Sequence, residues 1–293
     1  YAYVNMMHCS VIIPHLNQTD HLRKCINALT EQESDGINFE IIVVDNGSEG
    51  NIEEVVNSNS IKVLYVKDIQ NPYACRNHGI QYSQGEVVAF LDAKCVPTKN
   101  WLKHGFRKSV DFDIVAGRYN VESDMKLSSK VFPLMYLNSR KNVQKKHGVT
   151  AGNLFVKRHV FDVLGKFKTT STSGNDILFT KRAIYEGLTI GSAERAVVNY
   201  PKKEFGSLIS DIGKYGKGSA LTGQKSFLNV FSYLMPMRFT TMRSAIKYRK
   251  FEFSLVEKVK IWFYIWRAKI QFAFGIIQGL LLNSPKEQGQ STL

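Results

Sequence analysis

Cysteine and histidine patterns typical of disulfide-rich or metal-binding proteins are missing from this 293-residue sequence. The four cysteines are widely spaced and include no C-x-x-C pair: Cys9, Cys25, Cys75 and Cys95. The histidines show no spacing typical of metal ligands. A signal peptide is also not expected, because Tyr1–His8 lacks a basic region followed by an apolar core. These absences predict reduced cysteines in a cytosolic protein.

Acidic residues are scarce relative to basic ones. The sequence has 39 Lys or Arg residues against 25 Asp or Glu residues, a formal net charge of +14. Three kinds of acidic partner fit such an excess: nucleic acid, an anionic membrane surface, or a phosphate-bearing substrate. No helix-turn-helix, RNP or zinc pattern accompanies the charge, so we expect no nucleic-acid partner. Hydrophobic residues make up 44% of the chain, which is enough for a folded core.

The C-terminal part has no uninterrupted apolar run of the roughly 20 residues that a membrane-spanning helix needs. The segment Val259–Leu282 is rich in Trp, Phe and Ile, but three basic residues interrupt it: Lys260, Arg267 and Lys269. A helix lying in a membrane interface fits this pattern, with Trp262 and Trp266 near the lipid headgroups. A helix packed on the rest of the chain, or a dimer contact, is the alternative. We expect a basic, aromatic helical extension over residues 205–283 and a polar tail over 284–293.

The first half of the sequence alternates between strand-like and helix-like segments. Four apolar runs predict buried strands: Cys9–Ile13, Phe39–Val44, Ile61–Val66 and Glu86–Leu91. Helical spacing lies between them in three segments: Asp20–Gln32, Asn51–Ser58 and Pro72–Ser83. This alternation predicts an α/β fold with a mostly parallel sheet and flanking helices. Further strands are predicted at Asp113–Gly117 and Ala151–Val156, and a further helix at Asp176–Glu186.

Polar segments follow three of these strands, at the end of a parallel sheet where ligands bind. They are Pro14–Asn17, Asp45–Ser48 and Asp92–Pro97. Asp45 is suited to accepting a hydrogen bond from the imide N–H of a base, and equally to forming a turn. Asp92 closes a buried strand, where a carboxylate needs a partner such as ribose hydroxyls or a metal.

An ordered set of motifs resembles glycosyltransferase family 2. The opening pair is S-V-I-I-P-x-x-N at Ser10–Asn17 and E-I-I-V-V-D-N-G-S at Glu40–Ser48. The next pair is A-C-R-N-H-G-I at Ala74–Ile80 and G-E-V-V-A-F-L-D-A at Gly85–Ala93. Three later segments continue the order: A-G-N-L-F-V-K-R at Ala151–Arg158, G-N-D-I-L-F at Gly174–Phe179 and K-Y-G-K-G at Lys214–Gly218. Each motif alone is weak, but together they cover about Ser10 to Thr222.

The resemblance implies a GT-A fold, the Rossmann-like fold of nucleotide-diphospho-sugar transferases. It places the catalytic domain at residues 8–204, with a donor-binding half over 8–118 and an acceptor-side half over 119–204. The residues implied in binding the donor nucleotide are Pro14, Asn17, Asp45, Arg76, Asp92, Ala93 and Lys94. The guanidinium group of Arg76 suits a phosphate or a neighbouring carboxylate, although an exposed helix charge is the alternative. The resemblance favours a UDP-sugar as donor.

The metal motif departs from the family pattern. Family members have D-x-D at this position, and the last carboxylate binds Mn²⁺ or Mg²⁺. This chain has Asp92-Ala93-Lys94, and a protonated lysine repels a cation instead of binding it. Either Lys94 itself neutralises the diphosphate, so that no metal is needed, or the domain is a degenerate relative. A cation held by Asp92 and water alone is the weaker alternative.

On the acceptor side, the resemblance implies that Asp176 is the general base and that Gly152, Asn153 and Asn175 line the site. Asp176 at a helix start is equally suited to capping the helix, without any catalytic role. Lys214 and Lys217 are candidates for a lid over the diphosphate, with neighbouring glycines as hinges, although a solvated basic helix face fits as well.

The function implied is inverting transfer of a sugar from a nucleotide sugar to a hydroxyl of a glycan or lipid-linked acceptor. Cell-envelope or extracellular polysaccharide synthesis is the expected setting, with the protein cytoplasmic and peripheral at the inner face of the membrane. The alternative is a catalytically degenerate domain that serves as a binding or scaffold subunit, which the lysine at position 94 motivates.

Overall fold

The computed structural model describes residues 8–56, 60–122, 126–135, 138–249 and 251–283, which divide into two compact units. Within the described residues, the first unit comprises 8–122 and 138–202, and the second comprises 126–135 and 203–283. The division near residue 203 lies close to the boundary suggested by the sequence. Residues 126–135, which the sequence analysis placed in the acceptor-side half, belong to the second unit.

An eight-stranded mixed sheet forms the centre of the first unit, in the order β3-β2-β1-β4-β7-β6-β8-β5. Its strands are β1 (Cys9–His15), β2 (Phe39–Asp45), β3 (Ile61–Tyr65), β4 (Val87–Leu91), β5 (Val96–Pro97), β6 (Ile114–Val121), β7 (Asn153–Lys157) and β8 (Ile190–Tyr200). The first four strands pair in parallel, as the sequence predicts. Strand β7 runs antiparallel to both of its neighbours, β4 and β6.

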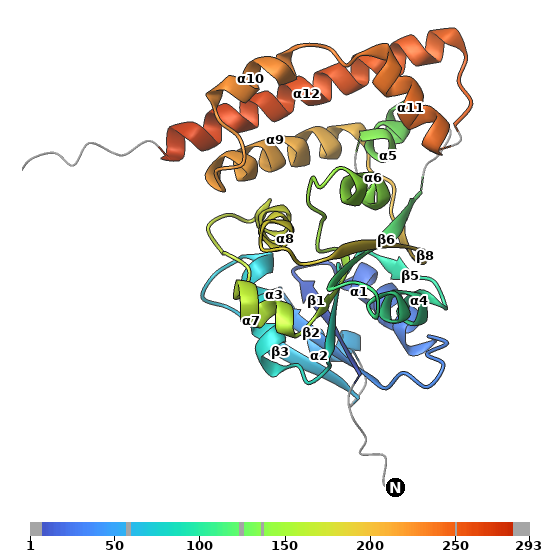
Figure 1. Cartoon of the computed structure of the whole chain (residues 1–293), viewed down its shortest axis with the longest axis vertical. Helices are drawn as coiled ribbons and strands as arrows, with labels where there is room; N and C mark the ends of the chain where they lie inside the picture. The colour runs from blue at the N-terminus through green and yellow to red at the C-terminus, as the bar shows by residue number, and fades with distance from the viewer. Residues whose placement is uncertain (1–7, 57–59, 123–125, 136–137, 250, 284–293) are drawn as a thin grey trace, which may run out of the picture. The chain divides into compact units, whose positions relative to one another are not determined.

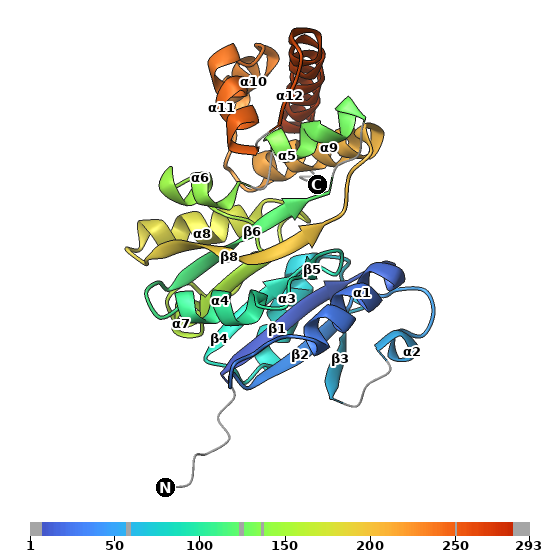
Figure 2. The same ribbon diagram turned by 90° about the vertical axis from the view of Figure 1, so that its right-hand side faces the viewer.

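Helices cover both faces of this sheet (Figures 1 and 2). Helices α1 (Thr19–Thr30) and α4 (Trp101–Lys108) lie on one face. The other face carries α3 (Pro72–Tyr82), α7 (His159–Leu164) and α8 (Asn175–Tyr185). The short helix α2 (Ile52–Val56) contacts α1, and α6 (Ser139–Gln144) contacts β6 and β8. The helices predicted at Asp20–Gln32, Pro72–Ser83 and Asp176–Glu186 are confirmed to within two residues; the end of the one predicted at Asn51–Ser58 lies outside the described residues.

Aromatic side chains fill the core on each side of the sheet. Phe90 of β4 packs edge-on against Phe167, with ring centroids 5.3 Å apart. On the opposite face, Trp101 and Phe155 lie 4.9 Å apart. All four side chains are buried, and each contributes about 1.5–3 kcal/mol by leaving water.

The start of α3 fixes a loop that belongs to the site. Asn71 caps the helix, because its side-chain oxygen accepts a hydrogen bond from the Tyr73 N–H at 2.8 Å. Its side-chain amide donates to the carbonyls of Thr169 and Ser171, at 3.0 and 3.2 Å. One asparagine therefore ties α3 to the segment that leads into α8.

The second unit is helical. It contains the 3₁₀ helix η1 (Leu127–Lys130), α5 (Val131–Met135), α9 (Phe205–Leu221), α10 (Phe227–Leu234), α11 (Phe239–Arg249) and α12 (Leu255–Asn283). Helices α9 and α12 pack closely because glycines face each other at the contact. A Cβ atom on Gly216 would lie 2.2 Å from the Phe272 carbonyl oxygen, and one on Gly275 would lie 2.1 Å from the Gly213 carbonyl oxygen. Among the described helices, α12 included, none combines the length and apolarity needed to cross a membrane.

Candidate active site

The carboxylate of Asp45 lies at the end of β2 and is held by its own loop. Its Oδ1 contacts Nδ1 of His15 at 2.9 Å and accepts a 2.5 Å hydrogen bond from the Ser48 hydroxyl. Its Oδ2 accepts hydrogen bonds from the backbone N–H groups of Gly47 and Ser48, at 3.0 and 2.9 Å. Burial alone would raise the pKa of Asp45, but these hydrogen bonds together outweigh it and lower that pKa. The carboxylate is therefore ionised and fixed in orientation.

Two other residues predicted beside the base shape the same loop. Asn17 has a left-handed backbone conformation, with φ of 50°, and its side-chain oxygen accepts a hydrogen bond from the Glu49 N–H at 2.9 Å. Pro14 is half-buried in β1, where it pairs in register with Val44. Both residues join the β1 loop to the β2 loop that carries Asp45.

A buried ion pair lies at the end of β4, two strands from β2 and roughly 10 Å away by the usual strand spacing. The Arg76 guanidinium donates from Nη2 to Oδ1 of Asp92 at 2.7 Å. Only 6% of the Arg76 side chain is exposed, against 29% of the Asp92 side chain. Burial would lower the pKa of Arg76, but Asp92 and the neighbouring acidic groups raise it. Asp92 is thus accessible on one side and anchored on the other.

One nitrogen of the Arg76 guanidinium group makes no hydrogen bond to the described residues. This nitrogen, Nε, is buried. Such a donor in a native site usually receives an oxygen from a ligand or a water molecule.

Asp176 joins this ion pair through Tyr73. The Tyr73 hydroxyl donates to Oδ1 of Asp176 at 2.9 Å, and the Tyr73 ring faces the Arg76 guanidinium at 5.4 Å. Oδ1 also accepts from the Ile177 N–H at 2.9 Å, while Oδ2 accepts from the Ala151 N–H at 3.0 Å. Burial, followed by the charge of Asp176, raises the pKa of Tyr73 well above its ordinary value, so the phenol stays a donor. Arg76 therefore brings together the strand-end carboxylate and the predicted base.

Gly152 is needed where the chain passes Asp92. A Cβ atom there would lie 2.6 Å from Oδ2 of Asp92 and 3.0 Å from the Tyr119 hydroxyl. The Gly152 carbonyl also accepts the Asp92 backbone N–H at 3.2 Å. The acceptor-side glycine thus borders the same site, because any side chain at that position would collide with the carboxylate.

Lys94 lies at this end of the sheet as well. Its ammonium group faces the ring of Tyr200 at 5.1 Å, a distance typical of a cation–π contact. Tyr200 in turn packs edge-on against Tyr119, with centroids 6.1 Å apart. The intervening Ala93 is buried. The aromatic pair therefore links Lys94 to the surroundings of Asp92.

Asn153 and Asn175 are buried and bound to the protein itself. Asn153 accepts a hydrogen bond from the Trp101 indole at 2.8 Å and donates to the carbonyls of Arg118 and Ala196. Asn175 donates to the Ser171 carbonyl at 2.8 Å. Both side chains thus have structural partners, and their acceptor-side role stays a prediction.

Three tyrosines of the site were not identified from the sequence: Tyr73, Tyr119 and Tyr200. Tyr73 stands three residues before Arg76 on a predicted helix, and this spacing places both on one face. That signal was available, whereas nothing local in the sequence places Tyr119 or Tyr200 beside Lys94.

The donor set offers a divalent cation one carboxylate, that of Asp92. Oδ1 of Asp92 already accepts the Arg76 hydrogen bond, and Lys94 supplies a positive charge where a second carboxylate would be needed. In the part of the chain that the structure describes, no group of three or more His, Cys, Asp or Glu side chains could hold a metal ion. The four cysteines are free and buried, as predicted.

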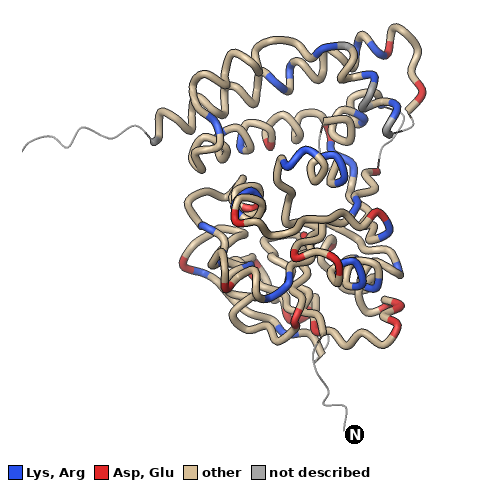
Figure 3. The backbone as a smooth tube through the Cα atoms, viewed as in Figure 1, with Lys and Arg blue, Asp and Glu red and all other residues tan. Residues whose placement is uncertain are grey.

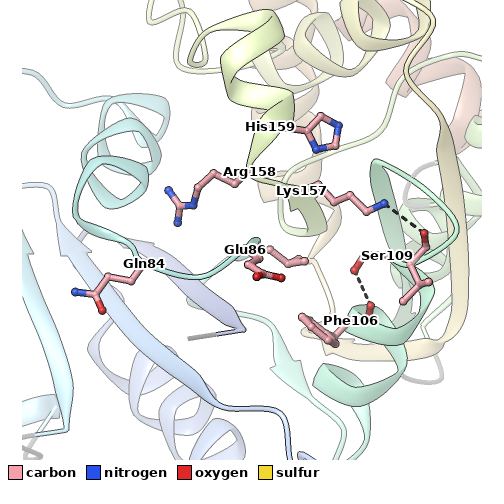
Figure 4. Close-up of a pocket in the computed structure, with 9 residues that line it drawn as sticks. Gln84, Glu86, Phe106, Ser109, Lys157, Arg158 and His159 are labelled. Carbon is pink, nitrogen blue, oxygen red and sulfur yellow. Dashed lines mark hydrogen bonds between the residues drawn. The ribbon is translucent and has the colours of Figure 1, made fainter. Parts of the chain in front are cut away.

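A pocket of about 430 Å³ lies at the opposite edge of the sheet (Figure 4). Gln84 and Glu86 precede β4 there, whereas Asp92 follows that strand. The Arg158 side chain donates to the Gly85 carbonyl and the Ser83 hydroxyl, and Lys157 donates to a backbone carbonyl. Arg158 and Lys157 of this pocket are thus already hydrogen-bonded to other groups of the protein. The pocket is lined by none of the predicted site residues.

Lys214 and Lys217 belong to the second unit, on α9. The helix is continuous through both lysines, and its glycines contact α12. Close helix packing therefore explains Gly213 and Gly216 without a hinge. The diphosphate lid stays a prediction.

Comparisons with known proteins agree with this geometry. The family model described as Glycosyl transferase family 2 matches residues 10–165. The chain is 30% identical over 218 residues to glycosyltransferase AglE of Haloferax volcanii, which covers 71% of this chain and 72% of AglE. It is 26% identical over 190 residues to poly(ribitol-phosphate) beta-N-acetylglucosaminyltransferase TarP of Staphylococcus aureus, covering 60% of this chain and 57% of TarP.

The fold is similar to that of mannosyltransferase PcManGT from Pyrobaculum calidifontis, solved with GDP-Man and Mn²⁺. The TM-score is 0.65 at 15% sequence identity, over 95% of this chain and 88% of that one. The mixed sheet with helices on both faces is thus the expected GT-A fold. With the family match over more than half of its length, the chain is a glycosyltransferase that belongs to glycosyl transferase family 2.

Proposed function

We propose that this protein moves a sugar, with inversion, from a nucleotide-sugar donor to a hydroxyl of a glycan or lipid-linked acceptor. The observation that carries the proposal is the grouping of two carboxylates, Asp92 and Asp176, around the buried Arg76. One carboxylate then serves the donor and the other the acceptor, as a single displacement requires. The name of the relative TarP specifies a polymeric acceptor, which supports a role in cell-envelope or extracellular polysaccharide synthesis.

The donor nucleotide binds at the carboxyl ends of β1, β2 and β4 in this proposal. Asp45 accepts the imide N–H of a uracil base, and the Ser48 hydroxyl is the partner most easily displaced because it can rotate. Pro14 and Asn17 form the wall beside the base. Asp92 accepts ribose hydroxyls, and the unused Nε of Arg76 donates to a donor oxygen. A UDP-sugar suits this arrangement.

Lys94 neutralises the diphosphate leaving group in place of a metal ion. A fixed ammonium group stabilises the negative charge that develops on the phosphate oxygens as the bond to the sugar breaks. The Tyr200 ring holds that ammonium group near Asp92. Lys214 and Lys217 add charge to the same diphosphate in the proposed lid.

Asp176 acts as general base through Oδ2. Oδ1 is engaged by the Tyr73 hydroxyl and the Ile177 N–H, whereas Oδ2 carries one described hydrogen bond and has room for another. Oδ2 takes the acceptor proton, and the acceptor oxygen attacks the anomeric carbon from the face opposite the diphosphate. The carbon–oxygen bond to the nucleotide breaks, and the nucleoside diphosphate leaves with the electron pair.

The acceptor-side wall is formed by the chain around Gly152, with Asn153 and Asn175 fixing its shape. We further propose that the enzyme works in the cytoplasm as a peripheral protein at the inner face of the cell membrane. The basic extension over residues 205–283 supports that location, since an anionic leaflet attracts such a segment.

Calorimetry with nucleoside diphosphates and rate measurements with nucleotide sugars test the proposal. We expect binding that survives EDTA. Asp176→Asn should lower the transfer rate by about 10²–10⁴ and leave nucleotide affinity within about twofold, because a general base acts on the chemical step. No binding of any nucleoside diphosphate, or full activity in Asp176→Asn, would refute it.

Lys94→Asp tests the leaving-group assignment separately. This variant restores the D-x-D pattern, so nucleoside diphosphate binding should weaken about tenfold in EDTA and recover with Mn²⁺. Lys94→Arg is the control that keeps the charge and should bind without metal. Wild-type binding that needs Mn²⁺ would overturn the role of Lys94 while leaving the transferase proposal intact. The alternative, a degenerate binding subunit that Lys94 also motivates, predicts nucleotide binding with no turnover.

A further inference from the structure

Helix α10 and the residue after it present an apolar face to solvent. Five large apolar side chains, between 40% and 82% exposed, form this α10 face: Phe227, Leu228, Phe231, Leu234 and Met235. On the opposite side of the helix, Val230 is buried against α12 and the Tyr233 ring lies 4.6 Å from that of Phe272. The helix is therefore apolar on both sides, and only one side is covered within this unit.

The α10 face is held rigidly. Three side chains of α12 donate hydrogen bonds to backbone carbonyls at the end of α10 and just after it: Trp266 to Leu234, Lys269 to Met235 and Trp262 to Met237. The indole N–H groups that the sequence analysis placed near lipid headgroups are thus used inside the protein. Phe263, which is 52% exposed, lies 6.3 Å from Trp266 and extends the apolar surface onto α12.

Positive charge surrounds this surface. Residues 205–283 contain 12 Lys or Arg against three Asp or Glu, and basic positions are distributed along these helices (Figure 3). Two of these cations contact α10 or the residue after it: the Lys225 ammonium group lies 5.5 Å from the Tyr233 ring, and Lys269 donates to the Met235 carbonyl. Arg238, three residues after Met235, is exposed. Exposed apolar side chains framed by cations match the chemistry of an anionic lipid surface, with an acyl boundary below a layer of phosphates.

We propose that the α10 face is the part of the protein that inserts into an anionic membrane surface. The proposal deepens, and rests on, the proposed peripheral location, and it names α10 as the element that inserts. A second copy of the chain fits less well, because two such units would bring 12 basic residues each into contact. A glycan also fits less well, since Leu, Met and Phe side chains offer its hydroxyl groups no hydrogen bonds.

Vesicle sedimentation of the full chain tests this assignment. We expect binding to phosphatidylcholine vesicles that contain phosphatidylglycerol, little binding to phosphatidylcholine alone, and weaker binding at high salt. The double variant Leu228→Glu/Phe231→Glu should lower partitioning at least about tenfold. The matched control Val163→Glu/Tyr185→Glu adds the same charge at two exposed apolar positions of the first unit and should bind like wild type.

Nucleoside diphosphate binding, measured on the same samples, separates the two proposals and shows that each variant is folded. Normal nucleotide binding without vesicle binding would refute the membrane surface and leave the enzyme proposal standing. Vesicle binding without nucleotide binding would refute the enzyme proposal and leave the membrane surface standing. Equal loss in both double variants, or a wild-type dimer that only the α10 variant dissociates, would also overturn the assignment to lipid.

Discussion

Asp45 and Asp92 end two parallel strands at the same edge of one sheet, yet their carboxylates have very different surroundings. Both oxygens of Asp45 receive hydrogen bonds from the residues that follow it, and the residue is 3% exposed. Asp92 accepts a side-chain hydrogen bond from one arginine, Arg76, which lies 16 residues earlier in the chain, and 29% of the Asp92 side chain is exposed. A carboxylate stabilised by its own loop keeps its place without a ligand, whereas one stabilised by a single cation has room for a ligand to bind.

The largest effect is expected from breaking the Asp92 side of this comparison. Asp92→Ala leaves the Arg76 guanidinium buried without its closest anion, which should cost about 3 kcal/mol of unfolding free energy in urea titrations. We choose the lower end of the range for buried pairs because Asp92 is partly exposed.

The double variant Arg76→Met/Asp92→Leu provides the control. It removes both charges, so it should be more stable than Asp92→Ala. If the unfolding free energy of Asp92→Ala lies within 1 kcal/mol of the wild-type value, water or Asp176 already compensates the charge of Arg76. The contrast with Asp45 then disappears.

A smaller effect is expected at Asp45. Asp45→Asn removes the charge that accepts four hydrogen bonds and should destabilise the protein by about 1–3 kcal/mol at neutral pH. Because the folded-state pKa of Asp45 is lowered below its ordinary value of 3.8, its contribution is complete above that value. It is then lost as the pH falls through the folded-state pKa.

The difference in stability between wild type and Asp45→Asn should therefore shrink in acid. Thermal unfolding from neutral pH to about pH 3 measures this change. Glu49→Gln, an exposed position of the same loop, should show little difference at any pH. A stability difference between wild type and Asp45→Asn that stays constant down to the lowest pH would mean that the carboxylate charge contributes nothing to stability.

The smallest effect concerns Asp176, whose environment is intermediate between the other two. Tyr73→Phe removes one donor to Oδ1, worth about 0.5–1.5 kcal/mol, and leaves two backbone donors. The value of kcat should fall about 2- to 10-fold while nucleoside diphosphate affinity stays within about twofold, because the lost hydrogen bond orients the proposed base.

Tyr82→Phe, on the exposed side of the same helix, should leave kcat unchanged. An equal loss of nucleoside diphosphate affinity would assign Tyr73 a packing role instead of one that positions the base.

The sequence predicted the parallel half of the sheet well because its signals are local. Each strand from β1 to β4 is an apolar run, polar segments follow three of them, and the connecting helices have regular spacing. The antiparallel insertion of β7 between β4 and β6 has no local signal, since it depends on pairing Leu91 with Asn153, residues far apart in the chain. The buried role of Asn153 was missed for the same reason: its partner, Trp101, lies 52 residues away.

Site residues followed the same division. Asp92, Arg76 and Asp176 lie in motifs whose order fixed their places, and the structure brings these three together. The tyrosines around them act through rings that meet across separate elements, which neither hydrophobic periodicity nor motif spacing records. The indole N–H groups of Trp262 and Trp266 donate to backbone carbonyls of Met237 and Leu234, contacts that the basic, aromatic pattern of their helix does not record.

The glycine contacts between α9 and α12 couple the two helices mechanically. With backbone against backbone at Gly216 and Gly275, neither helix can slide or tilt without the other. If Lys214 and Lys217 form the proposed lid, they therefore move together with α12 and with the α10 face, whose helix packs on α12. Under the two proposals, adsorption of the α10 face to lipid would restrict the movement of both lysines.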